Sequence, residues 1–132
     1  KARLQRLVKA FAKEAVTGVA VTLVSPETLR MCPHFFQMDR HLTVFSLKPK
    51  DGFAAESSVQ DFNVKDVAAI YKGAEVAAKA PSIAGIATLC VGLDTNRADK
   101  RLFFHFEEAL ERDKFYTCLK ILRMSIDISE PD

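Results

Sequence analysis

The sequence predicts a mainly β domain with helices: a seven-stranded antiparallel β-sandwich or half-open barrel, capped by a C-terminal helix and preceded by an N-terminal helix. Two short apolar segments, 86–93 and 101–106, flank the polar turn 94–100. After Glu107 the apolar spacing changes to i, i+3, i+4 and i+7, which indicates an amphipathic helix of about five turns. This order of elements is more typical of adaptor and membrane-targeting modules than of enzymes.

The composition indicates one globular domain. The chain has 132 residues, 48% of them apolar, and a net charge of +2. This charge is too small to predict nucleic-acid binding, and no apolar run is long enough to span a bilayer. Cys32, Cys90 and Cys118 are odd in number and widely spaced, so we expect reduced core thiols rather than disulfides or metal ligands.

Residues 1–15 predict a basic amphipathic helix. Four apolar residues form one stripe: Leu4, Leu7, Val8 and Phe11. Four cations lie on the opposite side: Arg3, Arg6, Lys9 and Lys13. A helix this short is marginal alone. We therefore expect the stripe to pack on the domain or on another chain; the alternative is that the helix lies on an anionic membrane, where each cation contributes about 1 kcal/mol.

Seven strands and a short helix are predicted next. The strands span 19–24, 29–38, 41–47, 59–64, 67–72, 86–93 and 101–106. Pro33 interrupts the second strand, where its missing N–H predicts an edge or a bulge. The alanine-rich run 74–80 predicts a short helix that ends before Pro81. The expected organisation is a helix at 1–15, one domain at 16–126 and an acidic tail at 127–132.

Two segments resemble the pleckstrin-homology (PH) family. Residues 62–73 (FNVKDVAAIYKG) resemble its strand-four to strand-five passage, and residues 104–122 (FHFEEALERDKFYTCLKIL) resemble its last strand and helix. Phe115 occupies the position where the family usually has a tryptophan, and the chain contains no Trp. The resemblance implies a PH-like sandwich with a capping C-terminal helix.

The basic N-terminal helix, the Trp-less last helix and the size resemble more closely the inner membrane complex sub-compartment proteins of apicomplexan parasites. This resemblance implies N-terminal myristoyl and palmitoyl groups on a segment before Lys1, and a place on the cytoplasmic face of the inner membrane complex. It further implies a role in pellicle organisation and daughter-cell formation.

A phosphoinositide site would need cations at the mouth formed by the strand 1–2, 3–4 and 6–7 loops. Of the PH family's basic pattern only Arg30 remains, because the first strand ends without a lysine. The expected mouth has five cations: Arg30, Lys48, Lys50, Arg97 and Lys100. It also has five acids: Glu27, Asp51, Glu56, Asp94 and Asp99. A near-zero local charge does not concentrate a polyanion, so we expect weak or no phosphoinositide binding.

Phe53 lies at the tip of the polar loop 49–58, where it could insert into a membrane, anchor a partner or fold back over the barrel. Catalysis has little support. His34, His41 and His105 lack metal-ligand spacing, and the glycines form no phosphate-binding loop. We expect no catalytic residue, no metal and no cofactor.

The main hypothesis is a non-catalytic PH-like scaffolding module of an acylation-anchored protein that binds protein partners. The alternative is a phosphoinositide-binding PH domain that targets membrane. A third hypothesis is self-association through Leu4, Leu7 and Phe11.

Overall fold

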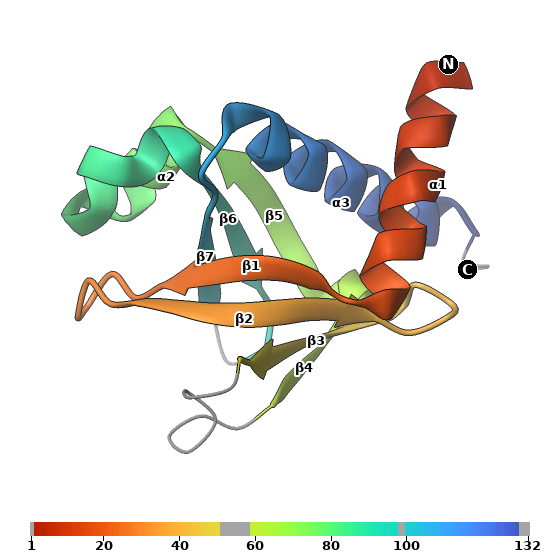
Figure 1. Cartoon of the computed structure of the whole chain (residues 1–132), viewed down its shortest axis with the longest axis horizontal. Helices are drawn as coiled ribbons and strands as arrows, with labels where there is room; N and C mark the ends of the chain where they lie inside the picture. The colour runs from red at the N-terminus through yellow and green to blue at the C-terminus, as the bar shows by residue number, and fades with distance from the viewer. Residues whose placement is uncertain (1, 51–58, 98–99, 130–132) are drawn as a thin grey trace.

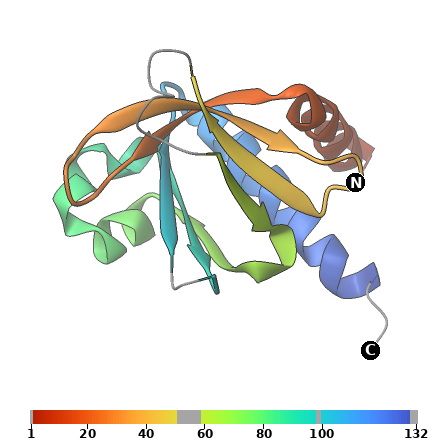
Figure 2. The same cartoon turned by 90° about the horizontal axis from the view of Figure 1, so that it is seen from below.

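The computed structural model describes residues 2–50, 59–97 and 100–129 and contains one antiparallel sheet with strand order β4-β3-β2-β1-β7-β6-β5 (Figures 1 and 2). The strands are β1 (Val19–Val24), β2 (Met31–Met38), β3 (Val44–Pro49), β4 (Gln60–Asn63), β5 (Val67–Lys72), β6 (Cys90–Thr95) and β7 (Arg101–His105). Because β4 and β5 are the two edges and do not pair, the barrel stays half open. The predicted seven-stranded fold class is confirmed.

The helices are α1 (Ala2–Thr17), α2 (Ala74–Lys79) and α3 (Ala109–Ser129), with 3₁₀ segments η1 (Val64–Asp66) and η2 (Pro81–Leu89). In Figure 1, α3 runs across the sheet, α1 stands beside it, and α2 with η2 lies at the other end of the molecule. This layout gives the domain two apolar cores.

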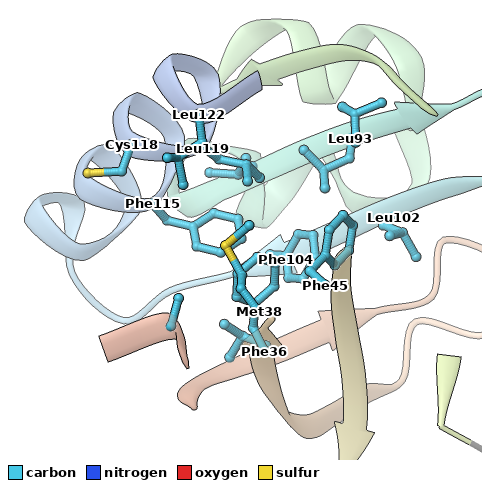
Figure 3. Packing of buried hydrophobic residues seen from close by; sticks show 14 of the residues in the cluster. Phe36, Met38, Phe45, Leu93, Leu102, Phe104, Phe115, Cys118, Leu119 and Leu122 are labelled. Carbon is cyan, nitrogen blue, oxygen red and sulfur yellow. The ribbon is translucent and has the colours of Figure 1, made fainter. Parts of the chain in front are cut away.

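The main core is built around Phe115, which α3 inserts into the concave side of the sheet (Figure 3). Its ring centroid lies 5.1 Å from that of Phe36, 5.0 Å from Phe104, 5.2 Å from Phe106 and 6.0 Å from Phe11. Phe115 is 2% exposed. Phe115 therefore holds β2, β7, α1 and α3 together.

The second core lies on the outer face of β5, β6 and β7, beneath α2 and η2. Its buried members include Tyr71, Ile83, Ala87 and Phe103. Gly92 in β6 is required there, because a Cβ on it would lie 2.2 Å from a ring carbon of Tyr71. The Tyr71 ring therefore lies directly on the β6 backbone.

This second core corrects one predicted element. Residues 86–89 belong to η2, and β6 begins only at Cys90, whereas the sequence predicted a strand from Ile86. A short apolar run has the same composition in a buried strand and in a buried helical turn. Here the run buries Ala87 and partly buries Ile86 against the outer face of the sheet.

The predicted starts of two strands and the predicted environment of Pro33 are also corrected. β2 begins at Met31 and β3 at Val44, a few residues later than predicted. Pro33 lies neither at a sheet edge nor in a bulge, because β2 pairs with β1 in continuous register. The Pro33 carbonyl accepts the Lys50 N–H just beyond β3. Proline has no N–H, but no ladder hydrogen bond is lost here, because that side of β2 lies beyond the end of β3.

The first helix packs on the domain. Phe11 is 2% exposed and Ala15 is fully buried in the main core, with Leu7 and Val8 packed against it. The Lys114 ammonium lies 2.6 Å from the Glu14 carboxylate, and the Gln37 side chain donates to the Val16 carbonyl at 2.9 Å. α1 is therefore part of the folded unit with residues 16–126.

We predict that Phe115→Ala lowers the free energy of unfolding by about 3–5 kcal/mol, because it leaves a cavity between two helices and the sheet. Urea unfolding followed by circular dichroism measures this loss. Leu110→Ala, on the same helix at 81% exposure, is the control and should change stability little. Equal losses in both variants would contradict the central role of Phe115.

We predict that Gly92→Ala destabilises the domain by roughly 1–3 kcal/mol or more, because the new methyl group collides with the Tyr71 ring. Gly85→Ala is the matched control, since nothing lies within 4 Å of its added Cβ. Thermal unfolding of the two variants compares them. A Gly92 variant as stable as the Gly85 variant would mean that Tyr71 does not lie on β6.

Candidate interaction surfaces

The predicted mouth is the first candidate site, and its described lysines and Arg97 contact different strands of the sheet. Arg30 is exposed at the end of the β1–β2 turn. The turn is closed by the Leu29 N–H, which donates to the Ser25 carbonyl at 2.7 Å. Leu29 itself has a φ of 62° and is exposed. Phe53 lies outside the described residues, so its predicted exposure at a loop tip stays a prediction.

Lys48 and Lys50 lie along β3 and just beyond it, beside side chains of β2. The Lys48 ammonium donates to the Gln37 side-chain carbonyl at 2.6 Å. The Lys50 ammonium lies 5.0 Å from the ring centroid of Phe35, which is 42% exposed. Cation–π contact with Phe35 and the bond to Gln37 place both charges against the surface of β2.

Arg97 and Lys100 lie instead at the start of β4. Both contact Phe62, with the guanidinium 5.5 Å and the ammonium 5.9 Å from the ring centroid. Arg97 also donates to the Asp61 carbonyl, and Lys100 to the Gln60 side-chain carbonyl. These two cations cover a ring that is itself buried and cap an edge-strand carbonyl.

Asp94, one of the predicted mouth acids, is paired within the protein. Its carboxylate accepts from the Tyr71 hydroxyl at 2.7 Å, pairs with Lys79 at 2.7 Å and lies 3.4 Å from the Arg101 guanidinium. Desolvation by burial opposes ionisation, but the bonds from Lys79 and Tyr71 prevail and hold the Asp94 pKa below its ordinary value.

Asp94, Lys79 and Arg101 line a cleft of about 960 Å³ between η2, the β1–β2 turn and the β6–β7 turn. Within this cleft the Asp94 carboxylate pairs with both Lys79 and Arg101. Desolvation and the Asp94 bond raise the pKa of Tyr71, so the phenol stays protonated and donates. The cluster accordingly fixes α2 to β5 and β6.

The second candidate site is an apolar groove of about 970 Å³ between α1, α3 and the β2–β3 turn, called here the α1 groove. Its described lining residues are Leu4, Gln5, Arg6, Val8, Lys9, Ala12, Leu42 and Ile121. The lining contains two cations and no acid. Leu4 is 44% exposed, a large open fraction for an apolar side chain on a folded helix.

Sequence reasoning found one wall of this groove and missed the others. Leu4, Arg6 and Lys9 were predicted as membrane or partner contacts, and all three line it. Arg3 is exposed on the same helix, whereas Phe11 is in the core and Leu7 is half-buried against it. Leu42 and Ile121 were missed, because only the tertiary structure brings α3 and the β2–β3 turn to α1.

The β2–β3 turn holds Leu42 in the left-handed region, with φ at 60°. The Asp39 carboxylate accepts the N–H groups of Thr43 at 2.7 Å and Val44 at 2.9 Å, and the Asp39 carbonyl accepts the Leu42 N–H at 3.1 Å. Slight desolvation raises the Asp39 pKa, but these hydrogen bonds outweigh it and lower the pKa below its ordinary value. A charged Asp39 therefore fixes the turn that presents Leu42.

The remaining chemistry-bearing side chains are dispersed. Cys90 and Cys118 are buried free thiols, and desolvation raises the pKa of each to about 11. Cys32 is a partly buried free thiol. Within residues 2–50, 59–97 and 100–129, no three His, Cys, Asp or Glu side chains gather as a metal site would require. In the same residues, no helix combines the length and apolarity needed to cross a membrane.

No family model and no curated protein matches the sequence. Solved structures do match its fold. Inner membrane complex sub-compartment protein 1 from Toxoplasma gondii aligns with TM-score 0.67 and 13% identity over 90% of this chain and 92% of that one. Sub-compartment protein 3 from the same organism gives 0.66 and 13% over 93% and 87%. The PH domain from TgAPH gives 0.64 and 14% over 96% of both chains.

The chain therefore has a PH-like fold, and it resembles the inner membrane complex sub-compartment proteins in that fold. The predicted resemblance to both is confirmed at this level. The match covers 90% of this chain for sub-compartment protein 1 and 96% for the PH domain from TgAPH.

We predict that the stability advantage of the natural chain over Asp39→Asn is present at neutral pH and vanishes in acid. The folded-state pKa of Asp39 lies below the unfolded value of 3.8, so its contribution is complete above that value and is lost as pH falls through the folded pKa. Urea midpoints of both proteins from neutral pH to about pH 2 test this. A gap that persists in acid would mean that the charge on Asp39 does not stabilise the turn.

Proposed function

We propose that this chain is a non-catalytic, PH-like protein-interaction module of a membrane-associated protein. The observation that carries the proposal is that four mouth cations already contact groups of the protein on two different strands. Lys48 and Lys50 lie against β2, and Arg97 and Lys100 lie against β4. A multiply charged inositol headgroup needs converging donors, whereas these cations already bind groups of the protein itself.

The fold neighbours support the setting. Two are named for the inner membrane complex of a parasite, and we propose the same setting here, with this domain organising protein partners during pellicle and daughter-cell formation. Membrane affinity would come from acyl groups on a segment before Lys1, since two lipid signals suffice for stable anchoring. In that arrangement the domain lies on the cytoplasmic face of the membrane.

The second candidate function is a phosphoinositide-binding PH domain. One observation favours it: Arg97 and Lys100 lie over the same ring, so two cations are close together at the β6–β7 turn. A headgroup could recruit this pair by replacing their contacts with Gln60 and the Asp61 carbonyl. The expected affinity is low, because the other mouth cations lie elsewhere.

Co-sedimentation with liposomes separates the two functions. We predict no binding that depends on phosphatidylinositol bisphosphate at physiological salt, because the cations do not converge. Matched variants are Lys48→Glu with Lys50→Glu, and Arg97→Glu with Lys100→Glu. Binding that needs the bisphosphate and is lost in either pair would overturn the proposal and establish a lipid-reading domain, whereas binding abolished by salt regardless of headgroup would agree with it.

A further inference from the structure

We infer that the α1 groove is a docking site for an acidic amphipathic helix of a protein partner. The inference rests on the proposed function, whose partner chemistry it specifies. It is carried by the groove's apolar floor, its fixed walls and the sign of its charges.

The floor runs along two turns of α1. Leu4, Val8 and Ala12 repeat every four residues and so share one face, and this row spans about 12 Å at 1.5 Å per residue. Leu42 from the β2–β3 turn and Ile121 from α3 face it across the groove. Apolar side chains from three separate elements thus line a space of about 970 Å³ that can receive apolar side chains of another helix.

The walls are fixed before any partner arrives. Phe11 and Ala15 anchor α1 in the core, and the Lys114–Glu14 ion pair ties it to α3. Asp39 fixes the turn that carries Leu42. The left-handed conformation of Leu42 is unfavourable for a leucine, and such strain is common at binding surfaces. A preformed groove lowers the entropic cost of docking.

A helix fits the groove better than an extended peptide does. The α1 and α3 walls are helices, whose backbone N–H and C=O groups bond within the helix itself. They therefore offer no ladder of backbone partners to an added strand. A helix satisfies its own backbone and needs only apolar contacts and charge pairing from the groove.

The charges select an acidic partner. Arg6 and Lys9 are part of the lining, and Arg3 and Lys13 extend the positive surface of α1. The only acid in α1 is Glu14, which pairs with Lys114. Two copies meeting through this surface would bring like charges together, which disfavours self-association. A flat bilayer would meet Leu4 but would not fill the space between α1 and the side chains of Leu42 and Ile121.

Two designed helical peptides of equal length and identical leucine spacing test the inference, one with glutamates and one with lysines on its flanks. Each is titrated into the isotope-labelled folded chain, and amide chemical shifts are followed by NMR. We expect the acidic peptide to shift amides around Leu4–Ala12, Leu42 and Ile121, and the basic peptide to bind at least about tenfold more weakly.

Variants locate the site. Leu4→Ser removes an exposed side chain from the groove and should weaken the acidic peptide about tenfold. Arg6→Glu with Lys9→Glu should abolish the preference for the acidic peptide. Leu110→Ser, an exposed leucine elsewhere on α3, is the matched control and should leave binding unchanged. Circular dichroism confirms that each variant is folded.

Four results would overturn the inference: no binding of the acidic peptide, shifts centred on the mouth, equal binding of both peptides, or an unaffected Leu4 variant. Groove shifts that grow with the concentration of the chain alone would assign the groove to a second copy instead. Groove shifts produced by anionic vesicles and not by peptide would assign it to membrane. None of these results determines the outcome of the liposome co-sedimentation assay with phosphatidylinositol bisphosphate. The inference and the proposed function can therefore fail separately.

Discussion

The fold depends on the packing of one aromatic ring, Phe115, against the concave side of the sheet. A half-open barrel has two unpaired edges and an interior that must be closed from outside. Helix α3 closes it by inserting Phe115 among Phe36, Phe104 and Phe106. Phe11 joins this cluster, so the same ring also fixes α1 and thereby the groove beside it. The position of the candidate interface consequently depends on the packing of the main core.

Four described cations of the predicted mouth contact groups of neighbouring strands. Arg97 and Lys100 shield Phe62 and bond to β4, at the edge where the barrel is open. Lys48 and Lys50 bond to side chains of β2. Binding a polyanion would require breaking these contacts first.

The basic helix α1 has a buried part and an exposed part that its sequence pattern could not separate. Its inner face, with Phe11 and Ala15, completes the main core. Its first two turns leave Leu4 and several cations open to solvent beside Leu42 and Ile121. An amphipathic pattern shows that a helix has an apolar face, but the face can be shared between the domain and a partner. The structure shows where that division falls along α1.

The sequence by itself determined most element types and their order, because alternation and helical spacing are local signals, and its resemblance to the PH family supplied the PH-like fold class. Local signals failed at Ile86–Leu89 and at Pro33, where burial under η2 and the end of β3 decide the conformation. The sequence also identified Leu4, Arg6 and Lys9 as candidate contacts. Only the tertiary structure gave the mouth cations their partners on β2 and β4 and brought Leu42 and Ile121 to α1, because contacts between residues distant in the chain depend on how the elements pack.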